Sequence, residues 1–188
     1  MDRRELLKMI TVLTGAAFVG GELMLTGCKN EPGIGGASFN AQDVGFLDEV
    51  ADTILPPTKS PGAKAAHVGQ FMTVMVNDCY DSKDQKTFHE GIGKLNDASK
   101  KANNKSFMEA TPAERTALLT SLDKEAKEYG AKKKKEDQAH YFTMMKQLTL
   151  FGYFTSKEGA TEALRYVKVP GRYEGCIEYK KGDKAWAT

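Results

Sequence analysis

The residue types that carry enzyme chemistry occur in this chain, but their spacing does not assemble an active site. The three histidines are scattered, and none stands at metal-ligand spacing from another histidine or from a cysteine. The glycines in residues 33–36 follow no predicted strand and do not match a nucleotide-binding loop. Asp48 and Asp52 share one face of a predicted helix, but such pairs are more often solvated or capping residues than an acid–base pair. We therefore expect no catalytic residue, no cofactor site and no metal site in this chain.

The most informative chemistry of the chain is near its N-terminus. Arg3 and Arg4 open a cationic stretch that precedes a mildly apolar run, residues 9–21. The run is shorter than the ~20 apolar residues that span a bilayer, and it matches the apolar region of a signal peptide. Its paired arginines and modest hydrophobicity look like a twin-arginine export signal. The alternative, an amphipathic N-terminal helix, is opposed by the glycines in and beside the run.

Leu-Thr-Gly-Cys at residues 25–28 looks like a bacterial lipobox, in which Cys28 is lipidated and becomes the first residue of the mature chain. We therefore expect residues 1–27 to be a signal peptide, residues 28–39 a flexible tether and residues 40–188 the folded domain. The expected location is the periplasmic side of a membrane, after twin-arginine export and lipid anchoring. That route is used by proteins that fold first, often around a cofactor. A chain without a cofactor motif has a reason to use the twin-arginine route when it carries a cofactor-bearing partner across the membrane.

The composition is that of one soluble globular domain. Removal of 27 of the 188 residues leaves 161, which suits a single hydrophobic core. The chain is 40% hydrophobic and 28% charged, and its net charge of +2 is too small to indicate a nucleic-acid partner. Residues 132–135 are four consecutive lysines. We interpret them as a solvated helix face, and contact with an anionic membrane surface is the alternative.

Hydrophobic periodicity and capping residues predict an all-α fold. The predicted helices run from a cap at Asn40 to about residue 54, over 65–80, from a capping box at Ser82 and Gln85 toward residue 100, from a cap at Thr111 to about residue 130, over 134–154, and over 156–166. From residue 167 onward the helical period stops. We therefore expect a single small helical domain of about five or six helices with an irregular C-terminal tail.

Two cysteines remain once Cys28 is lipidated. Export would place Cys79 and Cys176 in an oxidising compartment, where they could bridge each other or one could bridge a partner chain. Cys79 falls on the apolar face of its predicted helix, and a buried free cysteine is a common, inert core residue. The chain has no Cys-x-x-Cys and no Cys-x-x-Cys-His, so neither a zinc ribbon nor covalently bound c-type haem is indicated.

Segments near both ends of the predicted domain resemble the gluconate 2-dehydrogenase subunit 3 family. Asp-Thr-Ile-Leu-Pro at residues 52–56, followed by Pro-Gly-Ala at 61–63, resembles the opening of that family. The closing segment of the family is similar to Leu-Thr-Leu-Phe-Gly-Tyr-Phe-Thr-Ser at 148–156, Gly-Ala at 159–160, Ala-Leu-Arg-Tyr at 163–166 and Pro-Gly-Arg-Tyr at 170–173. The likeness covers most of residues 40–180.

The resemblance implies a role as well as a fold. Members of the family are small helical subunits of membrane-associated, flavin-dependent sugar or sugar-acid dehydrogenases. The large subunit belongs to the glucose-methanol-choline oxidoreductase family and holds FAD, and the small subunit often carries the twin-arginine signal for both. The expected role is therefore a non-catalytic accessory subunit, with a cytochrome electron acceptor left open. The alternatives are an independent envelope lipoprotein that acts as a binding module, or a small enzyme of unrecognised type.

An accessory subunit should expose apolar and aromatic residues beyond what its own core needs. Tyrosine, tryptophan and arginine anchor many interfaces, and the closing segment is rich in them. The residues that we expect at the partner interface are Tyr153, Arg165, Tyr166, Pro170, Arg172, Tyr173, Cys176 and Trp186. For Phe151 and Phe154, packing on the helical core is an equally good interpretation. We favour a disulfide from Cys176 to the large subunit over a bridge between Cys79 and Cys176.

Overall fold

The computed structural model describes residues 38–169, 171–172 and 175–187. Contacts divide the chain into two units, Met1–Ser38 and Phe39–Thr188, and all described helices and strands belong to the second. The predicted signal peptide, with Arg3, Arg4 and Cys28, and nearly all of the predicted tether lie outside the described residues. So do Pro170 and Tyr173 of the expected partner interface.

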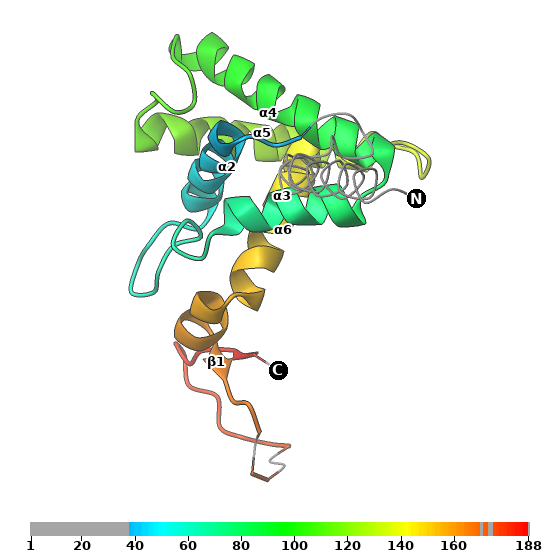
Figure 1. Cartoon of the computed structure of the whole chain (residues 1–188). Helices are drawn as coiled ribbons and strands as arrows, with labels where there is room; N and C mark the ends of the chain where they lie inside the picture. Colours follow the sequence, from blue (N-terminus) through cyan, green and yellow to red (C-terminus); the bar gives the residue numbers. More distant parts are fainter. Residues whose placement is uncertain (1–37, 170, 173–174, 188) are drawn as a thin grey trace, which may run out of the picture. The chain divides into compact units, whose positions relative to one another are not determined.

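The second unit is helical, and the predicted all-α class is confirmed. Its described elements are α2 (Ala41–Ile54), α3 (Val68–Cys79), α4 (Ser82–Asn103), α5 (Pro112–Lys132), α6 (Tyr141–Thr155), a π-helical turn η2 (Gly159–Ala163), and two short strands, β1 (Arg165–Tyr166) and β2 (Trp186–Ala187) (Figure 1). The strands pair in parallel, with Arg165 opposite Trp186. Strand β2 lies in the tail that we expected to be irregular. The α-helix predicted over residues 156–166 is wrong, because η2 and β1 occupy that stretch.

Two helices begin where their capping residues predict. The side chain of Asn40 accepts hydrogen bonds from the backbone of Gln42 and Asp43 and so caps α2. Thr111 caps α5 in a complete capping box, with Pro112 at the first helical position. The cap of α4 is Asp81 and not the predicted Ser82, because the Asp81 carboxylate accepts from the backbone N–H groups of Lys83 and Asp84.

Helices α3 and α6 both begin later than predicted. His67 has a φ of 52°, a left-handed conformation that an α-helix excludes, so α3 begins at Val68 and not near residue 65. In the lysine-rich stretch, the Lys134 backbone N–H donates to the Asp137 carboxylate at 2.8 Å and forms a turn instead of a helix. Helix α6 therefore begins seven residues later than predicted, at Tyr141.

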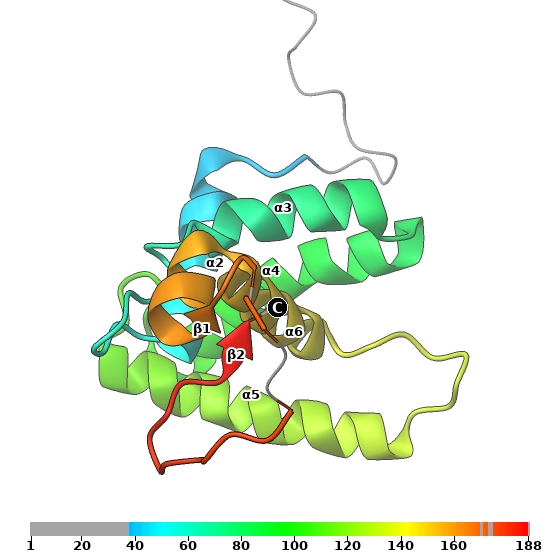
Figure 2. The ribbon, with the colours of Figure 1, turned by 90° about the horizontal axis from the view of Figure 1, so that it is seen from below.

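The core is one cluster to which all five α-helices contribute buried side chains. Helix α6 contacts each of α2, α3, α4 and α5, and Figure 2 shows it between α3 and α5. Close helix contacts depend on small residues. A Cβ atom at Gly69 would lie 2.6 Å from the Val44 carbonyl oxygen, and one at Gly91 would lie 2.6 Å from Cβ of Tyr141. These two glycines allow α3 to approach α2, and α4 to approach the start of α6.

Candidate partner-binding surface

The three histidines lie in or beside three different helices. His67 precedes α3, His89 stacks on Phe39 with ring centroids 4.0 Å apart, and His140 caps α6 by accepting the Phe142 N–H at 3.2 Å. Burial lowers the pKa of His140, which favours the neutral ring that this cap requires. Within the described ranges, no three His, Cys, Asp or Glu residues cluster as a metal site. None of the described helices is long and apolar enough to cross a bilayer.

Asp48 caps α3, and Asp52 holds the turn that precedes it. The carboxylate of Asp48 accepts the backbone N–H of Gly69 at 2.7 Å, in the first turn of α3. That of Asp52 accepts the backbone N–H of Lys64 at 3.3 Å. Both carboxylates therefore hold the connection between α2 and α3 in place.

A second polar contact joins α2 to α5. Glu49 forms ion pairs with both Lys64 and Arg115, and the Glu49 and Arg115 side chains are largely buried. Hydrogen bonds hold the pKa of Glu49 below its ordinary value; the bond from Lys64 contributes more than the bond from Arg115. Arg115 also donates to the carbonyl oxygens of Phe107 and Met108, at 2.9 and 2.7 Å. Because each of its three nitrogens donates a hydrogen bond within the domain, the guanidinium links α5 to α2 and to the residues before α5.

Tyr153 belongs to the core and not to the exposed surface where we expected it. It is 4% exposed, and its hydroxyl donates to the carbonyl oxygen of Pro61 at 2.6 Å. This hydrogen bond joins two segments that carry the family resemblance, one from each end of the domain. The sequence placed Tyr153 beside a predicted helix end, but the central position of α6 buries that end.

Exposed apolar side chains are concentrated in one part of the described chain. Twelve large hydrophobic residues are exposed, and only Met108 and Tyr129 lie outside α3, α6 and the region after η2. The other ten are Val74, Leu150, Phe151, Phe154, Tyr166, Val167, Val169, Ile177, Tyr179 and Trp186. This asymmetry is more than isolated surface apolar residues require, and it indicates an interaction surface.

Four of these residues lie on α3 and α6, two helices that pack against each other, and the sequence left Phe151 and Phe154 open between interface and core. We call Val74 of α3 together with Leu150, Phe151 and Phe154 of α6 the helical apolar patch; Val74 and Phe151 are each 51% exposed. The ring of Phe151 meets Phe71 of α3 edge-on, with centroids 5.5 Å apart. The sequence of α6 did indicate exposed apolar residues. This helix is apolar on nearly every face, whereas a helix that only packs on a core needs one apolar face.

The remaining exposed apolar residues lie in residues 164–187, which we call the C-terminal segment. There the Arg165 guanidinium lies 4.7 Å from the centroid of the Trp186 ring, and the Arg165 backbone N–H donates to Ala185 at 2.8 Å. Trp186 is 50% exposed, and Tyr166, Arg172 and Cys176 are exposed as well. The structure therefore brings Arg165 and Trp186 together from positions 21 residues apart.

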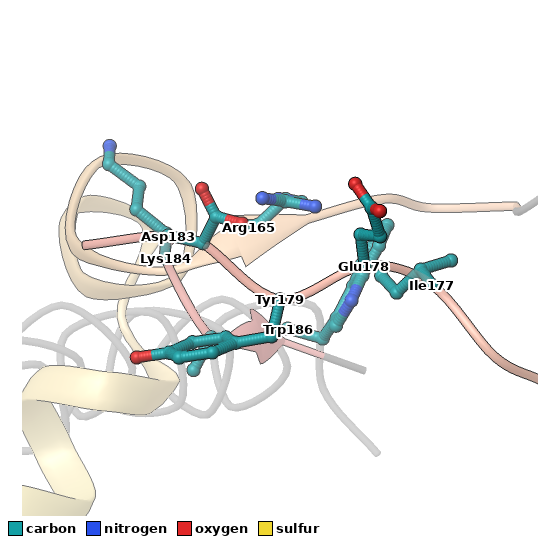
Figure 3. Close-up of a pocket in the computed structure, with 8 residues that line it drawn as sticks. Arg165, Ile177, Glu178, Tyr179, Asp183, Lys184 and Trp186 are labelled. Atoms are coloured by element: carbon teal, nitrogen blue, oxygen red, sulfur yellow. The ribbon is translucent and has the colours of Figure 1, made fainter. Parts of the chain in front are cut away.

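A pocket of about 430 Å³ opens beside this pair (Figure 3). Its walls come from both strands and the turn before β2: Arg165, Ile177, Glu178, Tyr179, Asp183, Lys184, Ala185 and Trp186. Lys184 donates to the carbonyl oxygen of Glu162 in η2, which ties the strand end to the π-helical turn. The turn itself needs Gly159, where a Cβ would collide with the carbonyl of Tyr153.

Both described cysteines are free and exposed. The expectation that Cys79 is buried is wrong. Cys79 is the last residue of α3, and Tyr80, which follows it, packs against the core in its place. The disulfide that we favour from Cys176 to a partner stays a prediction.

Comparison with known proteins adds one match. A family model described as Gluconate 2-dehydrogenase subunit 3 matches residues 41–171, which is more than half of the chain. The matched region contains α2 to α6, η2 and β1, and it ends within the C-terminal segment. No curated protein and no solved structure gives a significant match.

Proposed function

Because the chain belongs to the gluconate 2-dehydrogenase subunit 3 family, we propose that it is a non-catalytic accessory subunit of an FAD-dependent sugar or sugar-acid dehydrogenase. In this proposal the large partner subunit holds the FAD and carries out the oxidation. The present chain assists its folding, its twin-arginine export and its attachment to the membrane. Arg3 and Arg4 would supply the export signal, and a lipid on Cys28 would supply the anchor.

The observation that carries the proposal is the unequal distribution of exposed apolar residues. A subunit that works alone in water has no use for ten exposed large hydrophobic residues in one part of its chain. The helical apolar patch and the C-terminal segment together supply the aromatic residues and arginines that anchor interfaces. An independent lipoprotein with a binding role would also need such a surface, but the family match favours a dehydrogenase as its partner.

Co-purification with the dehydrogenase subunit tests the proposal. The full chain should bring down a large subunit that shows flavin absorbance. Deletion of residues 164–188 should abolish co-purification of the large subunit. The helix content measured by circular dichroism should stay nearly unchanged, because α2 to α6 do not include those residues. A loss of helicity would instead mean that the segment is part of the core. Co-purification that survives the deletion would contradict a binding role for the segment.

A matched pair of substitutions tests the helical apolar patch separately. Phe151→Ser removes an apolar side chain that is 51% exposed within the patch, and Met108→Ser removes one that is 46% exposed outside it. We expect the first change to weaken co-purification by about tenfold or more, since interface aromatics are common hot spots, and the second to leave it unchanged. Equal effects of the two changes would remove the patch from the interface.

A further inference from the structure

Charge is distributed unevenly along this chain. Residues 164–188 contain six basic and three acidic side chains, a net charge of +3, while the whole chain carries only +2. The other 163 residues therefore carry a net charge of −1. The C-terminal segment is thus one of the cationic parts of the molecule, with the lysines at residues 132–135, and an acidic surface complements it.

Arg165 is the cation in this segment whose position is best defined. Its guanidinium stacks over Trp186 at 4.7 Å, and its backbone is fixed by the pairing of β1 with β2. Among the described residues, no carboxylate lies within ion-pair distance of this guanidinium, although Glu178 and Asp183 also line the pocket. The Asp183 carboxylate accepts the Lys180 backbone N–H at 3.1 Å instead.

Stacking leaves the hydrogen-bonding edge of an arginine available. A guanidinium held flat against an aromatic ring keeps the in-plane N–H groups that can bind a carboxylate through two parallel hydrogen bonds. The pocket beside Arg165, at about 430 Å³, can admit a side chain from another protein. Trp186 and the exposed Tyr179 on its wall are residue types that shield such a contact from water.

We propose that the C-terminal segment binds an acidic surface of the dehydrogenase subunit, and that a carboxylate of that surface enters the pocket and pairs with Arg165. The inference rests on the proposed function, because it takes the dehydrogenase as the partner. The lysines around the pocket supply long-range attraction, which salt screens. The paired carboxylate at Arg165 supplies the specific contact, which salt weakens less.

Binding of the purified large subunit to the purified full chain tests this inference. The dissociation constant is measured at about 50 and about 500 mM NaCl, a range over which the Debye length falls well below 10 Å. Wild-type binding should weaken as salt rises. Arg165→Gln should weaken binding by about 30-fold or more at low salt, because one partner of a desolvated charge pair is lost.

Two further variants separate the effect of the Arg165 contact from the effect of net charge. Lys168→Gln removes one positive charge from the same segment but outside the pocket, and it should weaken binding by about threefold at most. Arg165→Lys keeps the charge but cannot make the stacked, two-pronged contact, so it should fall close to Arg165→Gln. Circular dichroism of each free variant reports whether the helices remain. The exchange rate of the residue 165 backbone N–H, which donates to Ala185, reports whether the strand pairing remains.

The outcomes distinguish the inference from the function on which it rests. If the wild-type chain does not bind the large subunit at all, the proposed function fails. If it binds, but salt has no effect or Arg165→Gln and Lys168→Gln behave alike, the acidic contact at Arg165 is overturned while the accessory role stands. A full effect of Arg165→Gln with the helices and the strand pairing intact supports the inference.

Discussion

Asp48 of α2 caps α3 from across the interface between the two helices. Its carboxylate accepts the Gly69 backbone N–H at 2.7 Å, and the absence of a side chain at Gly69 lets α3 come close enough for this contact. His67, the residue at the N-cap position of α3, makes no side-chain cap of its own. Helix α3 therefore depends on a tertiary contact for an interaction that α2 and α5 obtain from adjacent residues.

Loss of this remote cap should destabilise the fold. We expect Asp48→Ala to lower the free energy of unfolding by about 1 kcal/mol, since the N–H of Gly69 loses its acceptor. Asp48→Asn keeps an acceptor oxygen and should lose less. Asp97→Ala, which removes an exposed carboxylate from α4, should change stability by no more than about 0.5 kcal/mol. Urea unfolding followed by circular dichroism measures all three; equal effects of Asp48→Ala and Asp97→Ala would contradict the capping role.

Two glycines in α4 should respond to the same substitution with opposite signs. At Gly93 a Cβ meets no atom within 4 Å, so Gly93→Ala should stabilise the protein by about 0.5–1 kcal/mol through the better helix propensity of alanine. At Gly91 a Cβ would lie 2.6 Å from Cβ of Tyr141, so Gly91→Ala should destabilise by about 1–3 kcal/mol. Thermal and urea unfolding of both variants provide the check. Stabilisation by both would mean that α4 and α6 can move apart at no cost.

The tie at Glu49 predicts a dependence of stability on pH. Hydrogen bonds from Lys64 and Arg115 lower the pKa of Glu49 in the folded state. The unfolded chain therefore takes up this proton more readily as the pH falls. The stabilisation is fully present above the unfolded pKa, near 4.3, and is lost as the pH falls through the lower folded pKa.

Glu49→Gln should flatten the fall in the free energy of unfolding between about pH 5 and pH 3, the range around the ordinary glutamate pKa. The matched control is Glu90→Gln, because the pKa of Glu90 is also lowered, by Lys94, but its ion pair is exposed. Solvent and salt screen that pair, so its effect should be smaller and should fade as salt is added. An acid profile of Glu49→Gln that runs parallel to the wild type would refute the prediction.

Export should depend on the arginine pair and not on charge alone. Replacing Arg3 and Arg4 together by lysine keeps the charge and removes the pair, and it should retain both this chain and its flavoprotein in the cytoplasm. Lys8→Gln removes a charge, keeps the pair and should leave export intact. Cell fractionation, with flavin absorbance as the readout, distinguishes dependence on the arginine pair from dependence on charge. A flavoprotein that still reaches the periplasm in the double variant would contradict joint export.

Acylation of Cys28 is a separate prediction. The mature chain should begin at Cys28 and carry acyl mass in the membrane fraction. Cys28→Ser should release it into the soluble periplasm. Intact-mass analysis of both fractions is the measurement, and a chain that still starts at Met1 would contradict it.

Local sequence patterns were sufficient wherever the structure depends on neighbouring residues. The caps at Asn40 and Thr111 each involve residues a few positions apart, and they place the starts of α2 and α5 correctly. The all-α class follows from these elements together.

Only the tertiary structure decided which residues of the closing segment are buried and which are exposed. Tyr153 and Phe151 lie two residues apart in one helix, yet α6 is central, so one enters the core against Pro61 and the other faces outward. The pairing of Arg165 with Trp186 likewise joins residues that no local period connects. The sequence by itself did not place the starts of α3 and α6, but it determined that α2 to α6 are helical and that interface residue types are present, because both are local properties. Their arrangement into one surface depends on long-range packing around α6, which local patterns do not contain.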